Sequence, residues 1–212
     1  GAGLFGSLLA DTIAGLGGND TVHALAGNDS ITLGSGNNLA FGQGGDDTLV
    51  GGTGLDTLYG GDGNDSIDAS LSAAGTLIDG GTGNNTIQGT AGGDTIGSGG
   101  GNDSIAGNAG ADSISDSGGA DTITGGIGND TLGVTGQFSV VHGGDGDDSI
   151  SASANQGTVT GDDGNDTIVL ASSQMTVTGD AGADTILGNA QSTATIDGGI
   201  GGDSIVAGTG GN

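Results

Sequence analysis

The sequence predicts an all-β solenoid in which short parallel strands stack in coils of about eighteen residues. Three observations predict it. A large aliphatic residue recurs every nine residues along almost the whole chain. Glycine-rich turns separate the aliphatic positions, and 54 of the 212 residues are Gly. The chain has no Pro or Cys and only 2% aromatic residues, which argues against a conventional globular core and excludes a disulfide framework.

The predicted strands follow the aliphatic position, beginning at Ile13. It recurs at 22, 31, 40, 49, 58 and 67, then from 78 to 186 in steps of nine, and at 196 and 205. Two steps differ from nine: eleven residues to Ile78 and ten to Ile196. Because side chains alternate along a strand, each aliphatic side chain points inward from a three-residue strand, and its Ser or Thr neighbour points outward. Two such segments complete a coil, which predicts two facing parallel sheets.

Six-residue turns precede the strands, and the fullest have the pattern Gly-Gly-x-Gly-x-Asp. They lie at 51–56, 60–65, 125–130, 143–148 and 198–203. Turn and strand together resemble the RTX nonapeptide repeat, GGxGxDxUx, in which U is a large aliphatic residue. The resemblance covers nearly all of the chain. It implies a right-handed parallel β-roll (a β-helix solenoid) with calcium in the turns, and we expect residues 1–212 to form one such roll.

The acidic residues are all Asp, and no Lys or Arg offsets them, so the formal net charge is −26. Turns of alternate repeats stack on the same flank, which places their acids in columns. One flank carries Asp11, Asp29, Asp47, Asp65, Asn85, Asp103 and Asp121. The other carries Asp20 and Asp56, and then Asp94, Asp112, Asp130, Asp148, Asp166, Asp184 and Asp203. Like charges about 5 Å apart destabilise the folded chain unless a cation lies between them.

We expect this cation to be Ca²⁺, because the available ligands are carboxylate and carbonyl oxygens. In RTX proteins each ion lies between stacked turns and binds the motif Asp of both, and the resemblance implies this role for the columns above. With about six gaps each, two columns would hold up to about twelve ions and would nearly balance the charge. An EF-hand is excluded, because its loop closes with a Glu and this chain has none.

The motif acids are unevenly distributed along the chain. We expect residues 1–131 to have acid-bearing turns on both flanks, and 132–212 to have metal-binding turns mainly on one. The turns at 134–139 and 152–157 keep the aliphatic residue in phase but have no acid. The neutral strip that they begin is either a solvated edge under relaxed constraint or a packing surface for a neighbour.

Charge and composition exclude several functions. A chain with no Lys or Arg has no cationic surface for nucleic acid and is repelled by anionic lipids. Its apolar runs are too short for direct membrane insertion. His23 and His142 are expected to point outward, and few catalytic residue types remain, so we expect no enzyme activity. The few Phe and Tyr residues are expected to be too scattered for a stacking platform.

Two functions remain. The first is a non-enzymatic, calcium-binding structural segment of a secreted bacterial cell-surface protein, such as an S-layer, adhesin or extracellular-matrix fibre component. Such a segment would fold on Ca²⁺ and could self-associate into a lattice or filament. The alternative is the calcium-binding repeat domain of a larger RTX toxin, protease or lipase. The resemblance implies an extracellular location and type I secretion. No basic, apolar leader opens the chain, and we expect it to be part of a longer protein.

Overall fold

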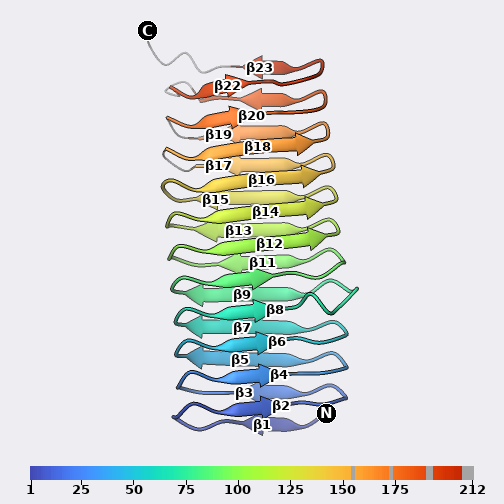
Figure 1. Ribbon diagram of the computed structural model, residues 1–212, viewed down its shortest axis with the longest axis vertical. Coiled ribbons are helices and arrows are strands. Elements are labelled where there is room, and N and C mark those ends of the chain that lie inside the picture. Colours follow the sequence, from blue (N-terminus) through green and yellow to red (C-terminus); the bar gives the residue numbers. More distant parts are fainter. Residues whose placement is uncertain (154–155, 172–173, 190–192, 207–212) are drawn as a thin grey trace.

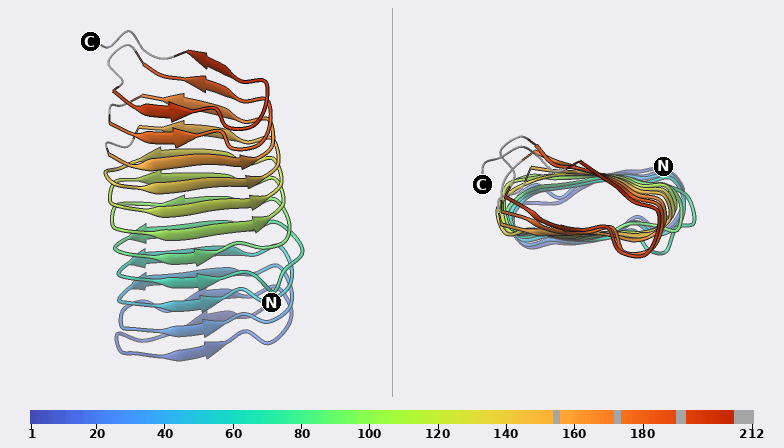
Figure 2. Two further views of the ribbon diagram at one scale, coloured as in Figure 1. Left: turned by 45° about the horizontal axis from the view of Figure 1, so that its top comes forward. Right: turned by 90° about the horizontal axis from the view of Figure 1, so that it is seen from above.

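A computed structural model describes residues 1–153, 156–171, 174–189 and 193–206. These residues form a solenoid of 23 strands and include no helix (Figure 1). The strands make two parallel sheets that face each other across a flat, slab-like molecule (Figure 2). No helix in the described part of the chain is long and apolar enough to cross a membrane. The predicted all-β solenoid is confirmed.

Successive strands alternate between the two sheets. The twelve-stranded sheet contains β1 (Gly3–Phe5), β3 (Thr21–His23), β5 (Leu39–Gly44), β7 (Thr57–Asp62), β9 (Leu77–Thr82), β11 (Thr95–Ser98), β13 (Ser113–Ser117), β15 (Thr131–Thr135), β17 (Ser149–Ala152), β19 (Thr167–Leu170), β21 (Thr185–Leu187) and β23 (Ser204–Val206). The eleven-stranded sheet contains β2 (Thr12–Ala14), β4 (Ser30–Thr32), β6 (Thr48–Val50), β8 (Ser66–Asp68), β10 (Thr86–Gln88), β12 (Ser104–Ala109), β14 (Thr122–Ile127), β16 (Val140–Asp145), β18 (Thr158–Asp163), β20 (Thr176–Thr178) and β22 (Thr195–Asp197). Many strands are longer than the predicted three residues, because their pairing continues into the turn.

The two irregular steps do not disturb the register of the sheets. Aliphatic residues pair with aliphatic residues throughout, as Ile13 does with Ile31 on β2 and β4. Across the eleven-residue step, Ile67 pairs with Ile87, and the extra residues form a loop that protrudes between β8 and β9 (Figure 1). In this loop the Ser72 hydroxyl donates a 2.8 Å hydrogen bond to the carbonyl of Gly54. This hydrogen bond links the inserted loop to the preceding coil.

The core is a row of aliphatic side chains from each sheet. All are at most 2% exposed: Val22, Ile31, Ala40, Leu49, Leu58, Ile67, Ile78, Ile87, Ile96, Ile105, Ile114, Ile123, Leu132, Val141, Ile150, Val159, Ile168, Val177 and Ile186. Each large member contributes about 1.5–3 kcal/mol through burial. Towards the ends of the stack burial is incomplete, and Ile205 on β23 is 44% exposed.

A second set of core residues was not predicted. We number the turn positions one to six, so that position six is the motif Asp and position one lies five residues earlier. Ala24, Leu33, Val134, Ala152 and Leu170 all begin a turn and are at most 1% exposed, and Ala69 is equally buried at the start of the longer loop 69–76. Position one follows the aliphatic residue by two, so the alternation of the strand turns it inward as well.

An aromatic row lies on the outer face of the twelve-stranded sheet. Phe5, His23, Phe41 and Tyr59 follow the aliphatic position on β1, β3, β5 and β7, and their rings stack nearly parallel with centroids 5.4, 4.7 and 5.0 Å apart. The expectation that the aromatic residues are too scattered to stack is therefore wrong. Register explains the difference, because residues eighteen apart along the chain are neighbours in the sheet.

Candidate metal centre

The full turns bring backbone carbonyl groups close to the next coil. Gly61 and Gly63, at positions two and four, have φ angles of 120° and 140°, which L side chains rarely adopt. A methyl group on Gly61 would lie 2.1 Å from the carbonyl oxygen of Gln43 in the preceding coil. One on Gly63 would lie 2.1 Å from that of Gly45. Glycine at these positions therefore lets carbonyl oxygens line the gap between successive turns.

The motif acids at position six form hydrogen-bonded columns. In each column the backbone N–H of one motif residue donates to Oδ1 of the motif residue in the next coil, as Asp130 does to Asp148 at 2.7 Å. The first column contains Asp11, Asp29, Asp47, Asp65, Asn85, Asp103 and Asp121. The second contains Asp94, Asp112, Asp130, Asp148, Asp166, Asp184 and Asp203. A short column contains Asp20, Asn38 and Asp56.

The structure thus places every predicted site residue in one of three columns. The short column and the second column are on the same flank but are not continuous, because the loop at 69–76 lies between them. There Thr76 takes the motif position and donates its N–H to Asp94 Oδ1 at 2.6 Å. On the other flank Ser139 follows Asp121 at the motif position.

Inside the columns, the second carboxylate oxygen is buried and has no hydrogen-bond partner. This is true of Oδ2 in Asp20, Asp29, Asp47, Asp65, Asp103, Asp112, Asp130, Asp148, Asp166 and Asp184. A methyl group on Gly143, at position one, would lie 2.3 Å from Asp148 Oδ2 and 2.5 Å from the carbonyl oxygen of Gly161 in the next coil. Carboxylate and carbonyl oxygens therefore converge beside the position-one glycine. Burying an unpaired charge in this way is costly unless a cation compensates it.

The pKa values of eight column carboxyl groups are raised, as expected when burial disfavours the charged form. Burial, as the largest cause, raises the pKa of Asp65, Asp112 and Asp166 to about 6 and that of Asp148 to about 7, and the charges of neighbouring acids add to the effect. Hydrogen bonds from the backbone oppose it but are weaker. Burial also raises the pKa values of Asp47, Asp56, Asp94 and Asp130. Without a cation, these eight carboxyl groups keep their protons to a higher pH than an exposed Asp does.

The described residues offer no positive charge to the columns. Their one contact of ion-pair length joins His142 Nδ1 to Asp162 Oδ2 at 3.5 Å, outside the columns, and is charged on both sides only when His142 is protonated. Except beside Asn38 and Asn85, the donor set of each gap consists of carboxylate and carbonyl oxygens from two glycine-rich turns. This set suits Ca²⁺, which takes six to eight oxygen ligands in adaptable geometry. The residues present therefore fit a calcium ion in the gaps.

Hydroxyl groups donate hydrogen bonds to the second carboxylate oxygen at three column ends. Asp11 Oδ2 accepts from the N–H and hydroxyl of Ser7 at 2.6 and 2.8 Å. Asp94 Oδ2 accepts from the N–H and hydroxyl of Thr90 at 2.7 and 3.1 Å, and Asp121 Oδ2 accepts from the Ser139 hydroxyl at 3.1 Å. These three predicted ligands have less free coordination capacity than the residues inside the columns.

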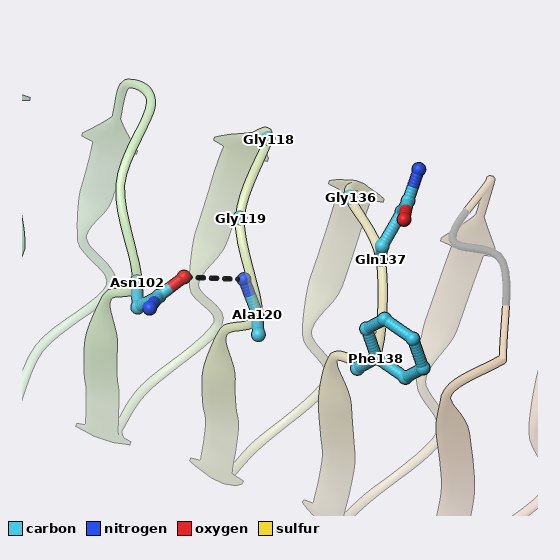
Figure 3. A pocket seen from close by; sticks show the side chains of 7 residues that line it. All are labelled: Asn102, Gly118, Gly119, Ala120, Gly136, Gln137 and Phe138. Carbon is cyan, nitrogen blue, oxygen red and sulfur yellow. Dashed lines mark hydrogen bonds between the residues drawn. The ribbon is translucent and has the colours of Figure 1, made fainter.

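Sequence reasoning missed an outer ladder of side chains at position five. There Oδ1 accepts the N–H of position five in the next coil, as Asn102 does from Ala120 at 2.9 Å (Figure 3). The other acceptors are Asn19, Asn28, Asn37, Asp46, Asn64, Asn84, Asn129, Asp147 and Asn165. Two hydrogen bonds from Asn165 lower the pKa of the exposed Asp147. The recurrence of Asn or Asp before the motif acid was the available signal.

Sequence reasoning also missed Asp116, which stands at position one where the full turns have Gly. Burial raises its pKa to about 9, with further contributions from the adjacent carboxyl group of Asp121 and from the charges of Asp121 and Asp103. The signal was an acid two residues after the aliphatic Ile114, on the inward face of β13.

A comparison with protein families matches most of the chain. The model of the RTX calcium-binding nonapeptide repeat (4 copies) matches residues 5–40, 41–71, 76–105, 97–132, 138–168 and 176–192. A search of curated proteins found no match. The family match, the nine-residue phase and the stacked acid columns agree. The chain belongs to the RTX calcium-binding nonapeptide repeat family.

Proposed function

We propose that this RTX repeat region is a non-enzymatic structural segment of a secreted bacterial cell-surface protein, and that its motif aspartates, with Asn85, are calcium ligands. One observation carries the proposal: ten motif carboxylates have a buried Oδ2 without a partner, in gaps lined by backbone carbonyls. Calcium ions between successive turns would compensate these charges. The predicted change from two metal-bearing flanks in 1–131 to mainly one in 132–212 is part of the proposal.

Calcium binding would then couple folding to location. Ion-binding free energy stabilises the folded chain, because the ligands come together only in the roll. Calcium is scarce inside cells and abundant outside, so the chain would stay unfolded during export and fold afterwards. Type I secretion to the cell surface accords with the RTX family match.

Calorimetric titration of the metal-free protein with Ca²⁺ tests the proposal, with circular dichroism before and after chelation. We expect several ions, up to about twelve, and loss of β-structure on adding EGTA. Mg²⁺ should not substitute well, because it demands near-ideal octahedral geometry and dehydrates reluctantly. Nor should 1 M NaCl substitute for Ca²⁺, because salt screens buried charges poorly. Binding of only one or two ions, or a roll indifferent to EGTA, would contradict the proposal.

Self-association into a lattice or filament belongs to the same proposal. Large apolar side chains are exposed on turns of the first coils: Leu8 is 76% exposed, Leu9 75% and Leu16 81%. Light scattering and electron microscopy, with and without Ca²⁺, test this. A strictly monomeric protein in both conditions would contradict assembly. A protease or lipase motif in the full-length sequence would instead make the roll an accessory to an enzyme.

A further inference from the structure

Asp116 is a carboxylate that the nonapeptide repeat does not supply. It occupies position one of the turn at 116–121, where the full turns at 60–65, 125–130 and 143–148 have Gly. The side chain is 2% exposed, and neither of its oxygens has a hydrogen-bond partner. No other described carboxyl group has both oxygens buried and unpaired.

Two motif acids of the first column lie against Asp116. Carboxylate oxygens of Asp103, Asp116 and Asp121 all lie within 4.8 Å of one another, and all three residues are buried. Asp103 Oδ1 accepts the N–H of Asn85 at 2.7 Å, and its Oδ2 has no partner. The residues of this buried cluster thus carry three unpaired oxygens: Oδ2 of Asp103 and both oxygens of Asp116.

The row of position-one side chains explains why Asp116 reaches these acids. One coil earlier, Ser98 occupies position one, and its Oγ lies 3.5 Å from Nδ2 of Asn85, the motif residue thirteen positions before it. Asp116 and Asp103 have the same separation in sequence. One coil later, position one is the buried Val134, which fills the corner with an apolar side chain. The cluster thus lies where the first column ends.

We propose that Asp103, Asp116 and Asp121 form an inner site for a hard divalent cation, of which Ca²⁺ is the expected occupant, and that this site terminates the first column. The inference rests on the calcium columns of the proposed function and adds a ligand outside the motif. Asp116 would supply the carboxylate that the next turn lacks, since Ser139 stands at its motif position. Three carboxylates would make this site more anionic than a gap between two motif acids, and correspondingly tighter.

An open surface hollow lies outside the same corner. Asn102, Gly118, Gly119, Ala120, Gly136, Gln137 and Phe138 line it (Figure 3). A methyl group on Gly136 would lie 3.1 Å from both Asp121 Oδ2 and the Ser139 hydroxyl oxygen, so the backbone of this turn adjoins the buried carboxylate.

Calorimetric Ca²⁺ titrations of Asp116→Asn and Asp116→Gly test the site. The first variant keeps the shape and removes the charge, and the second restores the motif glycine. We expect each to bind one ion fewer, or to lose at least tenfold in affinity at the tightest class of site. Asp79→Asn is the matched control, because Asp79 is exposed on β9 and only accepts the N–H of Gly81. It should bind as the unaltered protein does.

Thermal unfolding separates ligation from a structural role. Without metal at pH 5, where the roll is most stable, Asp116→Asn should leave the Tm nearly unchanged, because the buried carboxyl group is already protonated there. With Ca²⁺ it should reduce the increase in Tm. A merely structural Asp116 would give a lower Tm in both conditions, and that result would overturn the inference. Unchanged ion binding in both variants would do the same, and the calcium columns would stand. Failure of the unaltered protein to bind Ca²⁺ would refute the columns themselves.

Discussion

In several turns, the residue at position one is linked to whether oxygen atoms or apolar side chains fill the corner of the coil. Where it is Gly, as at Gly143, the inner oxygen of the motif Asp occupies the space beside it. Where it is Val134, Ala152 or Leu170, the motif acid is absent and the side chain joins the core. Position one therefore distinguishes these oxygen-lined corners from these apolar ones, whereas the turn at 24–29 combines the buried Ala24 with the motif acid Asp29.

Replacing Gly143 by Ala should damage one metal gap while leaving the sheets intact. The added methyl group would lie 2.3 Å from Asp148 Oδ2 and 2.5 Å from the Gly161 carbonyl oxygen, so both must move. We expect a loss of about 1–3 kcal/mol in the free energy of unfolding with saturating Ca²⁺. We also expect weaker binding of one ion. Urea unfolding and calorimetry measure the two effects.

Gly133→Ala provides the control for that variant. Its methyl group would meet nothing closer than 3.9 Å, and the residue lies on a strand outside the gaps. Equal effects of the two substitutions would show that added bulk, and not obstruction of an oxygen-lined gap, causes the loss.

At the scale of the element, each flank has two side-chain ladders that run in opposite directions. In the motif columns a backbone N–H donates to a side chain in the next coil, as from Asp29 to Asp47. In the outer ladder it donates to a side chain in the preceding coil, as from Asn64 to Asp46. A turn that has both ladders is therefore hydrogen-bonded through side chains to the preceding coil and to the next one. The inner ladder carries the charge, and the outer one is mainly neutral.

Removing an acid should matter more inside a column than at its end. Asp148 adjoins two gaps and has an unpaired Oδ2, whereas Ser7 already satisfies Oδ2 of Asp11. We expect Asp148→Asn to weaken the binding of one or two ions and to lower the Tm measured in Ca²⁺. A loss of 1 kcal/mol corresponds to about 2–4 °C in a chain of this size. Asp11→Asn should have a clearly smaller effect on both ion binding and Tm.

Differential scanning calorimetry with matched Ca²⁺ titrations compares the two variants. They differ from the unaltered protein by the same charge. Equal losses in both would show that net charge decides stability, and that position in the column does not.

The sequence predicted those parts of the fold that repeat with the nine-residue period. Ile31 and Ile123 are buried as expected, and the stacking of Asp47 on Asp65 follows from the same spacing. It did not predict the inward direction of Leu33, because a strand was expected to end before the turn. Asp116 was missed for the same reason. Its inward direction becomes evident only when the alternation of side chains along the strand is continued two residues beyond the aliphatic position.

At the scale of the whole molecule, the net charge of −26 is distributed between two environments. Exposed acids such as Asp145 and Asp147 lie in solvent, where water and salt screen them. The acids inside the columns are buried against each other, and burial raises several of their pKa values. Metal-free stability should therefore respond to pH through the buried acids.

The metal-free roll should become less stable as pH rises. Asp65, Asp112 and Asp166 have pKa values of about 6 in the fold and Asp148 about 7, against 3.8 as the ordinary value. Between about pH 4 and pH 7 the folded chain therefore binds more protons than the unfolded chain, and the free energy of unfolding falls as pH increases. With Ca²⁺ the sign reverses, because the ion and the protons compete for the same oxygens and binding strengthens as the carboxyl groups ionise. Circular dichroism of metal-stripped protein should show more β-structure at pH 5 than at pH 8, and Ca²⁺-saturated protein the opposite. A metal-free chain that gains β-structure from pH 5 to pH 8 would contradict the assignment of the buried Asp columns as the source of calcium dependence.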